Sequence, residues 1–181
     1  HRFVRGLMRS AARLTYAEVE DAINGRPGPR TAPLMARIIT PLLAAYRAMA
    51  EARDRREPLS IHVPEYRAKL GADGKVVSID QRPSLEAMKL IEEMMIAANV
   101  AAAETLEKAK TPLLYRVHEP PSDEKISAYA DYLSSVGLKF AKGQVIKPAA
   151  FNRLLARAKG GPHEAALNEL TLRTQSQARY D

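Results

Sequence analysis

The segment Lys89-Leu90-Ile91-Glu92-Glu93-Met94-Met95-Ile96-Ala97-Ala98-Asn99 lies in the strongest helical pattern of the chain and indicates a mainly helical fold. Apolar residues recur there at every third or fourth position, which predicts a helix with one apolar face over residues 84–110. That face is expected to carry Met88, Ile91, Met95, Ala98, Ala102 and Leu106. Ser84 is the expected N-cap, and Thr111-Pro112 ends the helix.

Five more helices are predicted on either side of this one. Thr15 and Glu18 form a T-x-x-E capping box, which starts a short helix that ends at Asn24-Gly25. Apolar residues at helical spacing predict a second helix over residues 33–57, with a kink at Pro41 and a charged, solvated end. The remaining helices are expected over residues 122–136, from Pro148 to Lys159, and from Pro162 towards Arg179.

A smaller β component is predicted between the second and third helices. Residues 66–70 alternate apolar with polar side chains, Asp73-Gly74 is a hairpin turn signal, and an apolar run follows at residues 76–79. Residues 2–8 alternate more loosely and predict a short strand. The expected fold class is therefore α+β, mainly α-helical with a small antiparallel β-ribbon.

Composition narrows the class of protein. The chain has 181 residues, enough for one domain or a large part of one, with 46% hydrophobic and 27% charged residues. It contains no cysteine, so disulfides are excluded and a reducing compartment, the cytoplasm, is expected. No apolar run approaches the ~20 residues that span a bilayer, so no membrane partner is expected. The net charge of +7 favours polyanions such as nucleic acid.

Catalytic groups are harder to find. The four histidines do not occur in pairs at zinc-ligand spacing, and no glycine-rich phosphate loop or G-x-S-x-G motif is present. No dense aspartate cluster of the kind that holds two magnesium ions occurs either. From the residues alone, the chain is not an obvious enzyme.

Glu92 and Asn99 are unusual because they share one stripe of an otherwise apolar helix. Two interpretations stay open for this glutamate. It lies at the edge of the apolar face and pairs with Lys89, or it contacts a ligand or partner, since buried carboxylates are rarely left unpaired.

Tyr16 is a second candidate, at the first turn of its helix and close in sequence to Arg9 and Arg13. A tyrosine in this position packs on the core in the commoner case. The other interpretation is that it presents its ring or hydroxyl to a nucleotide whose phosphates are held by the arginines.

Four stretches together resemble the ribonuclease II/ribonuclease R family, whose catalytic region is the RNB domain. Their order and spacing match the later part of that domain, and the third stretch is more similar to ribonuclease R than to ribonuclease II. The stretches are Ala12-Arg13-Leu14-Thr15-Tyr16 with Glu18-Val19, the segment over residues 89–99, Leu114-Tyr115-Arg116-Val117-His118-Glu119-Pro120-Pro121-Ser122, and Leu172-Arg173-Thr174-Gln175-Ser176-Gln177-Ala178-Arg179-Tyr180.

The resemblance implies a processive 3′→5′ exoribonuclease that hydrolyses single-stranded RNA to nucleoside 5′-monophosphates. Magnesium ions held by aspartates activate water in such enzymes. The tyrosine of the family's A-R-L-T-Y motif corresponds to Tyr16, and the first glutamate of its I-E-E motif corresponds to Glu92. Both positions are implicated in recognising the ribose, which suits a phenol or carboxylate that can hydrogen-bond a 2′-hydroxyl.

The sequence also departs from the complete family pattern. The family's catalytic aspartates would precede His1, and an arginine-bearing motif would follow Asp181, so residues 1–181 are expected to be the later portion of one catalytic domain, without a second domain. We expect no catalytic residue and no bound metal in this segment, inactivity when it is isolated, and self-association through exposed apolar surface. The rival hypothesis is a non-catalytic helical module that binds RNA or protein.

Overall fold

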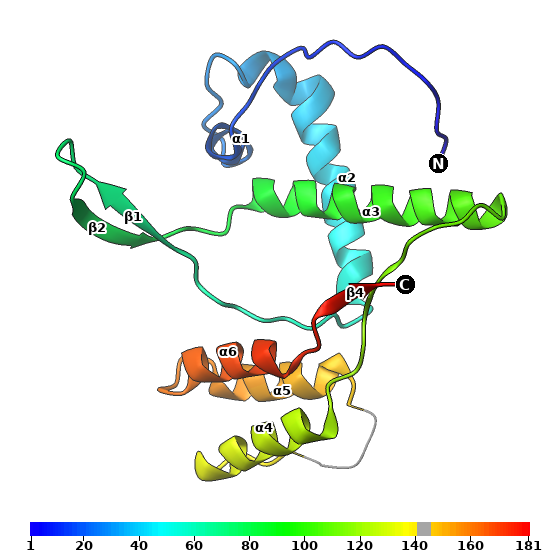
Figure 1. The fold of residues 1–181 in the computed structure, drawn as a ribbon. Helices are drawn as coiled ribbons and strands as arrows, with labels where there is room; N and C mark the ends of the chain where they lie inside the picture. Colours follow the sequence, from blue (N-terminus) through cyan, green and yellow to red (C-terminus); the bar gives the residue numbers. More distant parts are fainter. Residues whose placement is uncertain (141–145) are drawn as a thin grey trace. The chain divides into compact units, whose positions relative to one another are not determined.

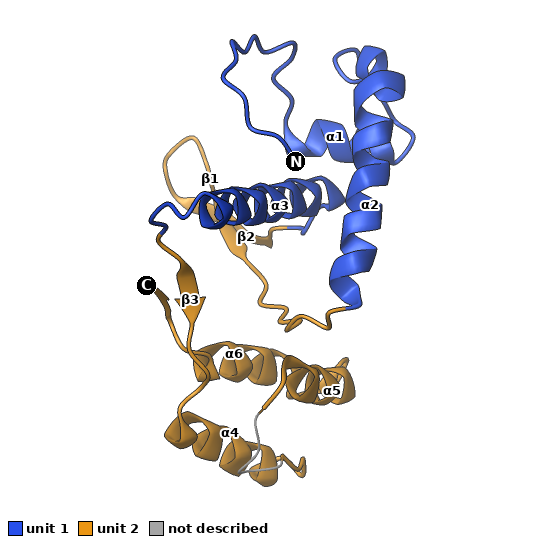
Figure 2. Ribbon diagram, turned by 90° about the vertical axis from the view of Figure 1, so that its right-hand side faces the viewer, with its two compact units in different colours: residues 1–55, 83–113 blue, residues 56–82, 114–181 orange. Residues whose placement is uncertain are grey.

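The computed structural model describes residues 1–140 and 146–181, and these form an α+β fold with six α-helices and four short strands (Figure 1). The predicted fold class is confirmed. The chain divides into two compact units, residues 1–55 with 83–113 and residues 56–82 with 114–181 (Figure 2). Among the described helices, none combines the length and apolar character of a membrane span.

The first unit contains three α-helices. These are α1 (Tyr16–Ile23), α2 (Thr40–Asp54) and α3 (Glu86–Lys108), and α2 passes behind α3 in Figure 1. Leu43 and Tyr46 of α2 pack with Leu90 of α3 in a small apolar core. This core explains why α3 forms part of a globular unit.

The predicted helix over residues 33–57 is present, but it begins irregularly. A 3₁₀ turn (Ala32–Leu34) and a π-helical turn (Met35–Ile39) precede α2, and the Thr40 N–H donates to the Met35 carbonyl, five residues back. Pro41 has no N–H to donate to the carbonyl four residues earlier, and its ring crowds that carbonyl. The wider turn relieves this conflict, so the predicted irregularity at Pro41 lies immediately before it.

The long helix was predicted correctly in type but not in its cap or its buried face. Leu85, not Ser84, occupies the N-cap position, and it makes no side-chain cap hydrogen bond. The buried residues are Ala87, Leu90 and Glu93. Residues of the expected apolar face stay exposed, as Ile91 (39%) and Met95 (60%) show. Apolar side chains occur on more than one side of α3, so periodicity alone could not select the side that α1 and α2 cover.

Three helices form the core of the second unit. These are α4 (Asp123–Ser135), α5 (Pro148–Ala158) and α6 (Glu164–Thr174). Their apolar core includes fully buried Leu133 and Leu167, with Phe151 against Tyr129. The Tyr129 hydroxyl lies 2.7 Å from the Thr171 hydroxyl, so its polar end is satisfied inside the core.

The predicted β-ribbon is confirmed. Strands β1 (Tyr66–Leu70) and β2 (Val76–Gln81) pair antiparallel, and the turn between them contains Gly74 at φ +75°. Glycine adopts this left-handed conformation without the penalty that a Cβ brings.

A second antiparallel pair joins β3 (Arg116–His118) and β4 (Ala178–Tyr180). The helix predicted from Pro162 towards Arg179 is present but shorter, because α6 ends at Thr174 and Ala178–Tyr180 pairs with β3 instead. The predicted strand over residues 2–8 was wrong, because no strand in the described part of the chain pairs with it and its backbone stays extended and exposed.

Candidate nucleic-acid interface

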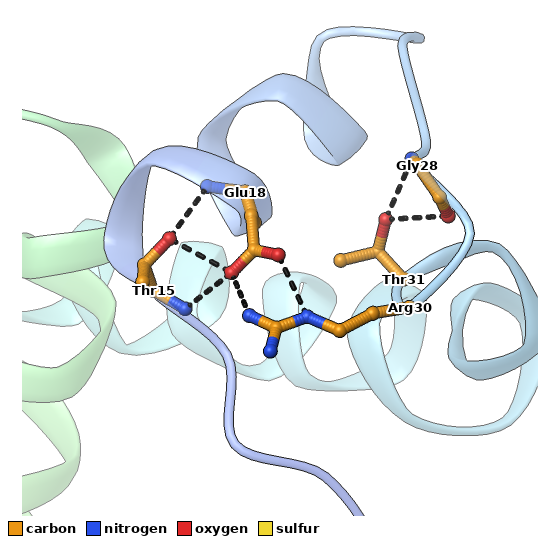
Figure 3. Close-up of polar contacts among 5 residues, drawn as sticks. All are labelled: Thr15, Glu18, Gly28, Arg30 and Thr31. Atoms are coloured by element: carbon orange, nitrogen blue, oxygen red, sulfur yellow. Dashed lines mark hydrogen bonds and ion pairs between the residues drawn. The ribbon is translucent and has the colours of Figure 1, made fainter.

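A capping box fixes the start of α1, the helix that carries Tyr16 (Figure 3). The Glu18 N–H donates to the Thr15 hydroxyl oxygen at 3.3 Å, and the Thr15 N–H donates to the Glu18 carboxylate at 2.9 Å. The predicted box is confirmed. Because Thr15 is the N-cap, Tyr16 is the first helical residue, and the reciprocal hydrogen bonds between Thr15 and Glu18 fix the backbone on either side of it.

Arg30 completes this arrangement with a forked contact. Its Nε donates to one oxygen of Glu18 at 2.8 Å, and its Nη2 donates to the other oxygen (Figure 3). The loop that carries Arg30 is tied by Thr31, whose hydroxyl oxygen accepts from the Gly28 N–H at 2.9 Å. Thr31 is 1% exposed, so this part of the loop is anchored in the unit.

These contacts set the charge state of Glu18. The hydrogen bond from Arg30, followed by those from Thr15, lowers the pKa of its carboxyl from 4.5 to about 2. The carboxylate therefore stays ionised at any physiological pH and is a poor proton acceptor. Its role is to hold the start of α1 in place rather than to transfer protons.

Tyr16 itself is 43% exposed, so the structure does not bury its side chain as a core residue. Arg9 and Arg13, in the preceding segment, are exposed and form no ion pair within residues 1–140 and 146–181. A phenol and two free guanidinium groups are thus available near the same helix start.

Helix α1 is joined to α3 at the N-terminus of α3. A Glu20 carboxylate oxygen accepts a hydrogen bond from the Ala87 N–H at 3.0 Å. Arg47 of α2 reaches the same end of α3, with its Nε 3.3 Å from Glu86 Oε1. Both helices that carry the predicted ribose-contacting residues therefore lie in the first unit and contact each other.

The two adjacent glutamates of α3 have opposite surroundings. Glu93 is 2% exposed, and its carboxylate forms an ion pair with Arg53 of α2. Glu92 is exposed, and its expected pairing with Lys89 is absent from the described part of the chain. Sequence alone does not distinguish the two carboxylates, because Arg53 lies in the charged end of the helix over residues 33–57, which is predicted to be solvated.

The described residues around Tyr16 and Glu92 include no group of side chains arranged to hold a metal. Among residues 1–140 and 146–181, no three acidic, histidine or cysteine side chains gather as a metal-binding group. The candidate groups are instead an exposed tyrosine on α1, an exposed carboxylate on α3, which contacts α1, and exposed arginines in the segment that precedes α1. Such groups can bind a sugar hydroxyl and phosphates, and none of them is arranged as a proton-transfer pair.

Comparison with known proteins identifies a family with this sequence. The RNB domain family matches residues 1–181. Ribonuclease R of Escherichia coli (strain K12) is 34% identical over 183 residues, and ribonuclease R of Vibrio parahaemolyticus is 33% identical over 183 residues. Each alignment covers 100% of this chain but 22% of the relative, so the chain spans about a fifth of the length of these proteins.

Solved structures share the fold. Mycoplasma genitalium RNase R in complex with ribose methylated single-stranded RNA matches with a TM-score of 0.78 and 20% identity, over 92% of this chain and 26% of that one. The same protein in complex with double-stranded RNA gives a TM-score of 0.79 at 20% identity, over 92% and 30%. At this identity the likeness establishes the fold.

Proposed function

Since the chain belongs to the RNB domain family, we propose that it is the later portion of the catalytic domain of a longer, cytoplasmic 3′→5′ exoribonuclease. The substrate would be single-stranded RNA, released as nucleoside 5′-monophosphates. The relatives' name, ribonuclease R, and the net charge of +7 both support this proposal. The RNA in the two Mycoplasma genitalium complexes supports it as well.

Within that enzyme, this segment would recognise the ribose through Tyr16 and Glu92. One observation carries the assignment: of two adjacent glutamates, only Glu92 presents its carboxylate to solvent, because the carboxylate of Glu93 is buried in an ion pair with Arg53. A carboxylate accepts a hydrogen bond from a 2′-hydroxyl, which DNA lacks. The exposed phenol of Tyr16 is able to donate or accept in the same way.

Hydrolysis would depend on magnesium, which supplies activated water and charge stabilisation in metal-dependent nucleases. The described residues do not fit that role, because they contain no cluster of acidic side chains able to hold the ions. We therefore assign the metal ligands to other parts of the longer protein and derive no bond-breaking step from residues of this chain.

The proposal predicts a loss of ribose selectivity when Glu92 is removed. In the full-length protein, Glu92→Ala should narrow the preference for RNA over the same sequence with 2′-deoxyribose at its 3′ end. A hydrogen bond to a charged group contributes about 1.5–3 kcal/mol, so the preference should fall about 10- to 100-fold. Tyr16→Phe, which removes only the hydroxyl, should act in the same direction.

Glu104→Ala is the matched control, because Glu104 is an exposed glutamate of the same helix and pairs only at the surface with Lys108. It should leave the preference unchanged. If Glu92→Ala cleaves both substrates at wild-type rates, the assignment is wrong. The rival hypothesis, a non-catalytic helical module for RNA or protein, gains if the full-length protein binds RNA but does not shorten it.

A further inference from the structure

Helix α3 depends on another helix for its N-terminal cap. The first turn of any helix has backbone N–H groups without intrahelical partners, which a side chain at the N-cap usually satisfies. Leu85 occupies that position and has no polar atom in its side chain. Glu20 of α1 supplies the missing acceptor, since its carboxylate takes the hydrogen bond from the Ala87 N–H at 3.0 Å.

The position of Glu20 relates this cap to both candidate ribose-contacting residues. Glu20 follows Tyr16 by four residues, so the two side chains lie on one face of α1, about 6 Å apart along its axis. Ala87 precedes Glu92 by five residues, about 7.5 Å along α3. The hydrogen bond between Glu20 and the Ala87 N–H therefore joins the two helix segments that carry Tyr16 and Glu92.

Other polar contacts nearby do not make this connection. Arg47 joins α2 to the start of α3, and the Glu18 contact with Arg30 joins α1 to its own following loop. In the described part of the chain, the hydrogen bond from the Ala87 N–H to Glu20 is the contact that joins the start of α3 directly to α1. Its loss should let α1 shift against α3 while each helix stays formed.

We propose that Glu20 is a positioning residue for ribose recognition: its carboxylate fixes the start of α1 against α3 and so holds Tyr16 and Glu92 at the separation that one ribose requires. This inference rests on the proposed function of those two residues. Glu20 touches neither substrate nor metal in this scheme. It acts through the placement of two helices, and small misplacements of binding groups are costly because hydrogen bonds depend steeply on distance.

The test uses the full-length enzyme and measures kcat/KM on RNA and on the same oligonucleotide with 2′-deoxyribose at its 3′ end. Glu20→Ala should lower the RNA preference about 10-fold. Glu20→Gln should keep most of it, because its amide oxygen still accepts from the Ala87 N–H. Glu20→Asp, a milder variant that withdraws the carboxylate by one CH₂ group, should fall between the two.

A double variant distinguishes a positioning role of Glu20 from a merely structural one, because it measures whether the effects of Glu20 and Glu92 on RNA preference depend on each other. Because Glu20 acts by placing Tyr16 and Glu92, the effects of Glu20→Ala and Glu92→Ala should not be independent: the double variant should lose less RNA preference than the product of the two single losses. Ile126→Val, a small core truncation in the second unit, serves as the stability control. It should lower the melting temperature without changing the RNA preference.

Two results would overturn the inference in distinguishable ways. If Tyr16→Phe and Glu92→Ala lower the preference but Glu20→Ala leaves it at the wild-type value, Glu20 has no positioning role and the proposed function stands. If neither Tyr16→Phe nor Glu92→Ala changes the preference, the proposed function fails, and the inference about Glu20 fails with it.

Discussion

The ion pair between Glu93 and Arg53 allows a sharp prediction about stability. The Glu93 side chain is 3% exposed and that of Arg53 is 28% exposed, so removing the arginine leaves a carboxylate in the core of the first unit without its partner. Breaking one side of a buried pair costs about 3–5 kcal/mol, against 0.2–1 kcal/mol for an exposed pair. Arg53→Met should therefore lower the free energy of unfolding by about 3–5 kcal/mol, a large share of the 5–15 kcal/mol typical of a domain.

The assay is urea unfolding followed by circular dichroism, with Arg55→Met as the matched control. Arg55 lies on the same helix end and pairs with Glu51, but both side chains are exposed, so its replacement should cost less than about 1 kcal/mol. The double variant Arg53→Met/Glu93→Leu should recover most of the loss, because it removes both charges. The buried Arg53 Nε, which has no hydrogen-bond partner in the described chain, favours that recovery. Equal losses of unfolding free energy for Arg53→Met and Arg55→Met would show that the Glu93–Arg53 pair contributes no more than an exposed pair.

Three further predictions concern pH, salt and association. The folded-state pKa of Glu18, about 2, lies below its ordinary value of 4.5, so the stability advantage of wild type over Glu18→Gln should be complete above about pH 4.5 and vanish as pH falls to about 2 in denaturation curves. Arg153 and Arg157 of α5 are exposed and make no ion pair in the described chain. Replacing both with Gln should make the slope of log K against log salt concentration, for binding of single-stranded RNA, less negative by about 1.4. Arg173→Gln, whose arginine already pairs with a glutamate, should not change that slope. The isolated 181-residue chain should self-associate through exposed apolar side chains of α3, giving a sedimentation coefficient that rises with concentration, and a constant monomer value would contradict this.

The features predicted correctly from the sequence are those that neighbouring residues determine. The capping box at Thr15 and the hairpin around Gly74 each need only a few consecutive residues, and both are present. The cap of α3 was not predictable in this way, because Ala87 is satisfied by a carboxylate 67 residues away. The strand at the end of the chain likewise depends on β3, more than 50 residues earlier.

In the candidate site too, some features follow from the local sequence and others depend on residues far away in the chain. Tyr16 and Glu92 were selected by resemblance to a family, and the structure adds that both are exposed and lie on helices that contact each other. Glu93 could not be separated from Glu92 by sequence, because the side of α3 that is buried depends on Arg53 and the packing of α2. Tertiary contacts thus determined which of two identical residues remains available to a ligand.

The proposed exoribonuclease activity is tested most directly by a degradation assay on 5′-labelled single-stranded RNA with magnesium, using the 181-residue chain and the full-length protein side by side. We expect the full-length protein to shorten the RNA from its 3′ end and the 181-residue chain to leave it intact, because no metal-binding cluster occurs among its described residues. Magnesium-dependent degradation by the isolated chain, free of contaminating nuclease, would contradict this account of where the chemistry lies, and no degradation by the full-length protein would contradict the proposed activity itself.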